Sequence, residues 1–200
     1  MLYYDFLGKR KNTFKKTWEL IKDKDDIVIV ELGTSRSFRG GGKSSDINDW
    51  FPNNPEKWAW SDGVFTKLFA DNLDKLNKKY TLYTIDPCPT AMDVVKVMCS
   101  KNKNVKPIMN TSTQFLKMLN CKIDLLYCDH LESSEEACLK HLQDAKIVIE
   151  NDLMKDDGII LIDDCDKNNN GKGKYSIPYL LNNNYKSIIY EYQNVLVRDS

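Results

Sequence analysis

Acidic side chains follow four apolar runs of the sequence, at the positions where buried strands would end. Glu31 and Asp86 follow the first two runs, Asp129 follows the third, and Asp163 and Asp164 follow the fourth. Carboxylates accept hydrogen bonds from hydroxyl groups and bind hard metal ions. Parallel strands place their carboxyl ends at one edge of a sheet, so we expect these acids to gather at one ligand site. The alternative for each acid is a structural role at the start of the next helix.

The positions of these acids suggest separate chemical tasks. Asp86 ends the strand after a glycine turn, where a carboxylate can accept from both hydroxyls of a ribose. Asp129, Asp163 and Asp164 offer three hard oxygen ligands that suit Mg²⁺ or Ca²⁺. His130 follows Asp129 directly and could act as a general base, because an unperturbed histidine titrates near neutral pH. The alternative for His130 is a polar loop residue or a contact to a helix N-terminus.

The glycine-containing turns favour a ligand site at a small-residue loop over a P-loop or a dinucleotide-binding fingerprint. Gly33 opens a small-residue loop, where backbone can approach a ligand closely. Gly42-Lys43-Ser44 is similar to the end of a phosphate-binding P-loop, but Ser37 stands where the first glycine of that motif belongs. Ser35 stands where the second glycine of a dinucleotide fingerprint belongs. These mismatches argue against a P-loop nucleotidase and against a dinucleotide-dependent enzyme.

Apolar runs alternate with helical periodicity along most of the chain, which predicts a mostly parallel α/β sheet closed by an antiparallel hairpin. The predicted strands are Ile27–Glu31, Thr81–Ile85, Val105–Met109, Ile123–Cys128, Ile159–Ile162, Ser187–Tyr192 and Asn194–Arg198. The predicted helices are Thr13–Lys22, a helix after Ser61, Met92–Cys99, Gln114–Leu119, Ser133–Asn151 and Tyr175–Leu181. Asp156-Asp157-Gly158 is interpreted as a tight turn, and His141 as a surface or groove residue in mid-helix.

Two segments have no sustained period and are interpreted as loops. Residues 36–60 carry a run of three glycines and three tryptophans, so we expect a partly ordered flap over the ligand edge. Trp50, Trp58 and Trp60 could close the site against water or could simply pack the flap. Residues 166–174 form a polar, glycine-containing loop. No domain boundary is evident, so residues 1–200 are expected to form a single domain.

The composition narrows the class of protein. Lys+Arg and Asp+Glu are both 29, and this balance makes a nucleic-acid partner unexpected. No apolar run reaches the length of a membrane span, and the N-terminal charges follow the apolar residues, which is the wrong order for a secretory signal. The six cysteines form no Cys-x-x-Cys pair and suit reduced, buried thiols. A cytoplasmic protein without a membrane partner is expected.

Four segments together resemble the class I S-adenosylmethionine-dependent methyltransferases, and within them the methyltransferase-24 group, which includes macrocin O-methyltransferase-like proteins. The segments are Val30–Ser37, Tyr83–Pro87, Asp124–Asp129 and Leu153–Asp164. The resemblance spans roughly residues 26–165. It implies a Rossmann-like, doubly wound, mostly parallel seven-stranded sheet with an antiparallel C-terminal strand. It departs from the family at Arg36-Ser37, in place of the second motif glycine, and at His130–Glu135, in place of Asp-His-Ser-Tyr-Glu.

The resemblance also assigns roles to residues. It implies that S-adenosylmethionine is bound by residues at the ends of the first four strands, namely Glu31, Gly33, Thr34, Ser35, Asp86, Thr111, Ser112 and Asp129. Asp129 and His130 are the candidate catalytic residues. Metal-dependent members use acids at the fourth and fifth strand ends, here Asp129, Asp163 and Asp164, so Mg²⁺ is a candidate second cofactor.

The sequence therefore predicts an S-adenosylmethionine-dependent methyltransferase that methylates an oxygen of a small molecule or sugar. The flap and the 166–174 loop would contact this acceptor, whose identity is not encoded in any motif. The alternative is a protein of the same fold that binds cofactor or a partner without transfer, as a sensor would. The oligomeric state is left open, with a homodimer as one option.

Overall fold

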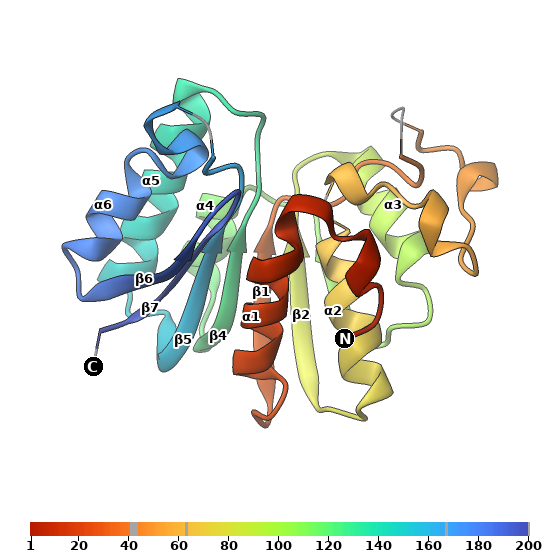
Figure 1. The fold of residues 1–200 in the computed structure, drawn as a ribbon, viewed down its shortest axis with the longest axis horizontal. Helices are drawn as coiled ribbons and strands as arrows, with labels where there is room; N and C mark the ends of the chain where they lie inside the picture. Colours follow the sequence, from red (N-terminus) through yellow and green to blue (C-terminus); the bar gives the residue numbers. More distant parts are fainter. Residues whose placement is uncertain (41–43, 63, 167, 200) are drawn as a thin grey trace.

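The computed structural model describes residues 1–40, 44–62, 64–166 and 168–199. Seven strands in these residues form one sheet, and their bounds are β1 (Ile27–Leu32), β2 (Tyr80–Ile85), β3 (Val105–Ile108), β4 (Ile123–Cys128), β5 (Met154–Ile162), β6 (Tyr185–Tyr190) and β7 (Asn194–Arg198). The strand order is β3-β2-β1-β4-β5-β7-β6 (Figure 1). β1 to β5 run parallel to one another, and β7 pairs antiparallel with β5 and β6. The predicted doubly wound fold is thus confirmed.

Helices cover both faces of this sheet. The first face carries α1 (Lys11–Ile21), α2 (Phe65–Lys75) and α3 (Pro89–Met98), and the second carries α4 (Ser112–Met118), α5 (Glu135–Glu150) and α6 (Ser176–Leu181) (Figure 1). Successive residues of β1 serve the two faces, since Ile29 packs into the first core and Val30 into the second. Burial on both faces explains why this strand is a continuous β-branched run.

Helix starts follow from capping side chains. The Ser134 hydroxyl accepts from the Ala137 N–H at 3.1 Å, and two glutamates follow in the first turn of α5. Thr111 caps α4 in the same way, accepting from Gln114 N–H at 3.3 Å. These caps fix the directions in which both helices leave the carboxyl edge of the sheet.

The structure corrects two local predictions. Asp156-Asp157-Gly158 is part of β5 and not a tight turn, because the pairing with β4 jumps from Ile123–Met154 to Leu125–Ile159 and absorbs the extra residues as a bulge. His141 is buried at 2% exposure and does not lie on the surface. The other predicted helices and strands are present, with ends that differ by a few residues.

The segment between β1 and α2 is built from short 3₁₀ turns, η3 (Ile47–Asp49), η4 (Pro55–Lys57) and η5 (Trp60–Asp62). Trp58 is buried and its ring contacts those of Trp50, Trp60 and Tyr3 at 4.9–5.6 Å between centroids. The segment therefore packs beside the N-terminal residues, at the upper right of Figure 1. Gly42 and Lys43 of the P-loop-like triplet lie outside the described residues.

The remaining irregular segment, predicted as a loop over residues 166–174, contains the 3₁₀ turn η6 (Asn168–Gly173), and its Lys167 lies outside the described residues. Among the helices of the described chain, none has the length and apolar character needed to cross a membrane.

Candidate functional site

A pocket of about 790 Å³ opens at the carboxyl edge of the parallel strands. It lies where β1 and β4 are neighbours, and the connections after these strands lead to opposite faces of the sheet, to α2 and to α5. Such a switch point leaves a crevice in which doubly wound proteins bind ligands. Its lining includes Arg10, Gly33, Thr34, Arg36, Asp86, Thr111, Ser112, Asp129, His130, Glu132, Asp164, Lys172 and Tyr192.

Gly33 holds together the two loops at the floor of this pocket. Its φ is +88°, and its N–H donates to the Ile85 carbonyl at 2.8 Å. A Cβ at this position would lie 2.7 Å from His130 Cα and 2.9 Å from the Asp129 carbonyl carbon. A side chain is therefore excluded by the backbone that follows β4. The close approach seen here is to the chain itself, and the predicted close approach to a ligand stays a prediction.

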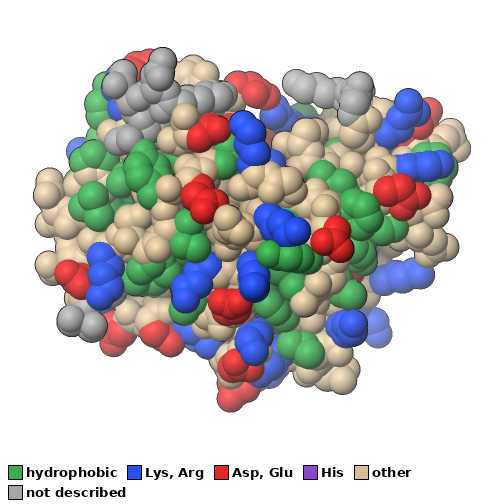
Figure 2. Space-filling view, in the orientation of Figure 1, with side chains coloured by type: hydrophobic (Ala, Val, Ile, Leu, Met, Phe, Trp, Pro, Cys, Tyr) green, Lys and Arg blue, Asp and Glu red, His purple; other side chains and the backbone are tan. Residues whose placement is uncertain are grey.

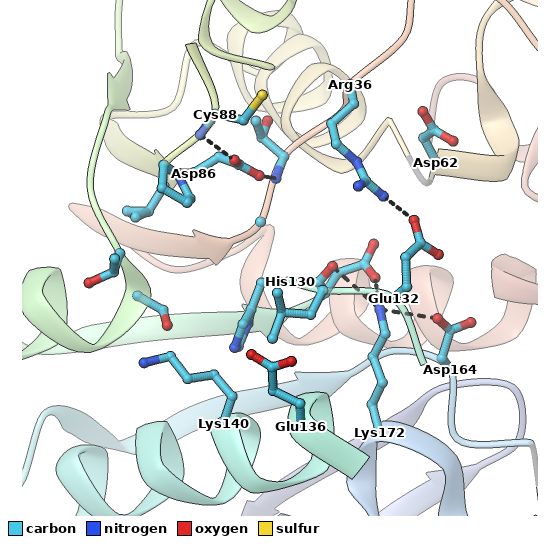
Figure 3. Close-up of a pocket in the computed structure, with 18 of the residues that line it drawn as sticks. Arg36, Asp62, Asp86, Cys88, His130, Glu132, Glu136, Lys140, Asp164 and Lys172 are labelled. Atoms are coloured by element: carbon cyan, nitrogen blue, oxygen red, sulfur yellow. Dashed lines mark hydrogen bonds and ion pairs between the residues drawn. The ribbon is translucent and has the colours of Figure 1, made fainter. Parts of the chain in front are cut away.

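Asp86 ties the loops after β1 and β2 to each other. Its carboxylate accepts from the Cys88 N–H at 2.8 Å and from the Thr34 N–H at 3.4 Å (Figure 3). Two hydroxyls at this end of the pocket, Thr34 Oγ1 and Ser112 Oγ, are buried without a hydrogen-bond partner among the described residues. Buried polar groups without partners are rare in proteins. This end of the pocket therefore fits a ligand with several hydroxyl or ring-nitrogen groups.

Two residues of the predicted cofactor set do not reach the pocket lining in this structure. Glu31 lies inside β1, and its carboxylate accepts from the hydroxyls of Thr66 and Thr84 on the first face of the sheet. Burial raises the pKa of Glu31 to about 8, although both hydroxyls stabilise its charged form. Ser35 is buried at 3% exposure. Their predicted contact with a cofactor stays a prediction.

Asp129, Asp163 and Asp164 do converge, and each offers an oxygen within 4.8 Å of the others. However, side chains already supply the positive charges. Lys172 Nζ lies 2.9 Å from Asp129 Oδ1 and 3.1 Å from Asp164 Oδ2 (Figure 3). Arg10 Nη2 lies 2.6 Å from Asp163 Oδ2, and its Nε donates to the other oxygen at 3.1 Å. With these cations in place, the three carboxylates do not fit a divalent metal ion.

Burial and charge act in opposite directions on this cluster. Burial disfavours the charge on Lys172, but the carboxylates of Asp129 and Asp164 more than offset it, so the pKa of Lys172 lies above its ordinary value. Burial also raises the pKa of the Asp163 carboxyl, while the Arg10 guanidinium lowers it. Gln193 donates to the same carboxylate at 2.7 Å, and the Tyr192 hydroxyl donates to Asp164. The cluster is a charged network whose members hold each other in place.

His130 lines the pocket, but its ring is turned toward α5 and away from the acid cluster (Figure 3). Its Nε2 lies 3.2 Å from Asp144 Oδ2, without the alignment of a hydrogen bond, and its ring stacks on that of His141 at 4.2 Å. Burial lowers the pKa of His141 well below its ordinary value. The structure therefore separates the two candidate catalytic residues: Asp129 belongs to the Lys172 cluster, and His130 to a buried pair of histidines.

Sequence reasoning missed several polar and charged residues of the site. Arg10 comes from the turn before α1, Lys172 from η6 and Tyr192 from the β6–β7 connection. Arg36 reaches across the pocket mouth to Glu132, 2.6 Å away (Figure 3). A run of glycines and asparagines around Lys172 was the one visible signal, and it indicated only a loop. None of the three flap tryptophans is among the described residues that line the pocket.

Comparisons with known proteins bear on the fold. No family model matches the chain, and no curated protein matches it in sequence. Solved structures do match. An rRNA methylase from Streptococcus thermophilus aligns with a TM-score of 0.60 at 10% identity, over 96% of this chain and 97% of that chain. SMU.1697c from Streptococcus mutans, in complex with SAH, aligns at 0.57 and 11% identity, over 92% and 97%.

Aeropyrum pernix fibrillarin, with natively bound S-adenosyl-L-methionine, aligns with a TM-score of 0.53 at 13% identity, over 97% of this chain and 76% of that chain. The fold is that of the class I methyltransferases. At these identities the likeness extends to the fold alone, and the resemblance to the methyltransferase-24 group stays a hypothesis. Because some of these neighbours are named for rRNA, they give no support to the expectation that a nucleic-acid partner is unlikely.

Proposed function

We propose that this protein is an S-adenosylmethionine-dependent methyltransferase. The observation that carries the proposal is the pocket at the β1–β4 switch point, with Gly33 at its floor and the Asp86 carboxylate at the end of β2. Asp86 would accept from the ribose hydroxyls, and Thr111 and Ser112 would lie beside the adenine. The buried Thr34 and Ser112 hydroxyls, which lack partners among the described residues, support a polar ligand at this end. The backbone after β1 would hold the methionine end.

The acceptor is proposed to be a hydroxyl group of a small molecule or sugar. The cofactor, when bound, supplies an electrophilic methyl group on a positively charged sulfur. Asp129 would accept the proton of the acceptor hydroxyl, because it lines the pocket at the end of β4 and is partly exposed. The Tyr127 hydroxyl donates to its other oxygen at 3.1 Å and fixes its orientation. The chain would contribute mainly alignment of the acceptor with the methyl group.

Charge supports a small acceptor over a polyanion. The described residues that line the pocket include six carboxylates and four Lys or Arg side chains, so the lining carries excess negative charge. Negative charge attracts the cationic cofactor and repels a phosphate backbone. On the face shown in Figure 2, blue and red side chains are interspersed without a large basic patch. The six cysteines are free, which suits the proposed cytoplasmic location.

Calorimetric titration with S-adenosylhomocysteine tests the cofactor claim. We expect a single site with micromolar affinity, and the absence of binding at millimolar ligand would contradict both an enzyme and a cofactor sensor. A screen of hydroxyl compounds and short RNAs with methyl-labelled S-adenosylmethionine then tests transfer. Binding without transfer to any acceptor class would favour the sensor, and transfer to RNA alone would refute the small-molecule acceptor.

A further inference from the structure

Lys172 is a buried lysine whose ammonium contacts two members of the acid cluster. Its side chain is 3% exposed, and its Nζ lies 2.9 Å from Asp129 Oδ1 and 3.1 Å from Asp164 Oδ2. The third contact of this nitrogen within the described residues is with the Asp129 carbonyl oxygen at 3.5 Å, the long limit of a hydrogen bond. An ammonium carries three N–H donors, and the one that faces this carbonyl makes the longest of the three contacts, so it is the donor that a ligand oxygen in the pocket would take over.

The backbone fixes Lys172 in this position. Its N–H donates to the Asp164 carbonyl at 3.1 Å. The preceding Gly171 has a φ of +51°, and a Cβ there would lie 1.8 Å from that same carbonyl oxygen. The Cys138 thiol of α5 donates to the Gly171 carbonyl at 3.1 Å. Lys172 therefore lies in a loop that hydrogen bonds hold to Asp164 on one side and to α5 on the other, and it is not a mobile surface side chain.

The charges around Lys172 leave no place for a second cation. Arg10 uses both oxygens of Asp163, so this carboxylate has no strong ligand position left for a metal ion. The other two acids share the ammonium. A divalent ion prefers six or more oxygen ligands, and it would have to enter within contact distance of a positive charge.

We propose that Lys172 takes the place that a divalent cation would take beside Asp129 and Asp164, and that its most weakly held N–H turns from the Asp129 carbonyl to bind the acceptor oxygen. The second half rests on the proposed methyltransferase function. A metal ion with several open positions binds two adjacent oxygens of a substrate, whereas one N–H binds a single oxygen. The site would therefore take a lone neutral hydroxyl group and would need no metal.

Titration with Mn²⁺ tests this proposal without an acceptor. Binding is measured as the loss of the free-ion signal in electron paramagnetic resonance. Lys172→Met keeps an unbranched side chain that ends one atom short of the ammonium position and carries no charge, so two carboxylates lose their cation. We expect no Mn²⁺ site in the wild type at millimolar ion and one new site in Lys172→Met. Lys172→Arg keeps a cation and should gain none.

Lys174→Met is the matched control, because Lys174 lies in the same segment and pairs with Glu135 in a more exposed ion pair. It should gain no Mn²⁺ site. A wild type that binds Mn²⁺ at this cluster, or a folded Lys172→Met that gains no site, overturns the proposal. If Lys172→Met does not fold, the wild-type and Lys172→Arg titrations still decide it.

The S-adenosylhomocysteine titration separates this proposal from the proposed function. Lys172→Met should keep its affinity for that ligand within about threefold, because the lysine lies at the acceptor end of the pocket. A wild type that binds no S-adenosylhomocysteine refutes the function but leaves the Mn²⁺ result meaningful. Any acceptor found must be methylated as fast with EDTA as without it, and a rate that requires a divalent ion overturns the inference.

Discussion

Substitution of Gly33 by alanine perturbs the floor of the pocket at one atom. The new Cβ would start 2.7 Å from His130 Cα and 2.8 Å from His130 N, and must move to at least the 3.4 Å of ordinary contact. All the nearest atoms belong to backbone, so the loops after β1 and β4 must separate. A residue with a Cβ in the left-handed region costs about 1–2 kcal/mol, and overpacking adds about 1–3 kcal/mol. We expect Gly33→Ala to lose about 2–5 kcal/mol of unfolding free energy.

The same displacement should weaken cofactor binding, because it moves the loops that form the floor of the pocket, and it should slow methyl transfer, because a misplacement approaching 1 Å costs about 100-fold in rate. Calorimetry with S-adenosylhomocysteine measures the loss of binding, and urea unfolding measures the loss of stability. Gly8→Ala is the control, since Gly8 has a φ of +52° and nothing within 4 Å of an added Cβ. It should lose about 1–2 kcal/mol from strain alone and bind normally. A Gly33→Ala protein that binds with unchanged affinity would refute the assigned role of this loop.

Three further changes have distinct readouts. Asp86→Asn should weaken S-adenosylhomocysteine binding about 10- to 100-fold in calorimetry, because charged hydrogen bonds contribute about 1.5–3 kcal/mol, whereas the exposed Asp93→Asn should not. The pKa of Glu31 is about 8 in the folded chain and roughly 4.3 in the unfolded chain. Between these two pH values the folded chain keeps a proton that the unfolded chain has released. The free energy of unfolding therefore falls as pH rises from about 4.3 to about 8. Glu31→Gln should remove this slope in urea unfolding between about pH 5 and about pH 8, and an unchanged slope would contradict the burial of the carboxyl group. Arg10→Met leaves Asp163 buried without its cation and should lower the free energy of unfolding by about 3–5 kcal/mol at neutral pH. The loss should be smaller in acid, where the Asp163 carboxyl can protonate. Equal losses at both pH values would contradict this reasoning.

The sequence was most informative about the sheet. Strands buried on both faces appear as continuous apolar runs, so β1 and β4 could be located from these runs alone. Parallel order then brings their ends to one edge, which is why Asp86, Asp129 and Gly33 were identified correctly as residues of that edge. The β5 segment was misjudged, since Asp156-Asp157-Gly158 has the composition of a turn but is held in the sheet as a bulge.

The electrostatics of the site could not be derived in the same way. Arg10 and Lys172 lie in irregular segments far along the chain from Asp163 and Asp129, so only the folded chain shows that they meet these carboxylates. Without these partners, three converging acids indicate a metal ion. Glu31 was expected at the ligand edge because it follows an apolar run, but β1 extends to Leu32 and turns this side chain inward.

The central claim is that the pocket at the β1–β4 switch point binds S-adenosylmethionine. A crystal structure with S-adenosylhomocysteine tests it most directly. We predict that the ribose hydroxyls lie on the Asp86 carboxylate, the adenine beside Thr111 and Ser112, and the methionine end over Gly33. A ligand bound elsewhere, or an empty pocket at saturating ligand, would contradict the account.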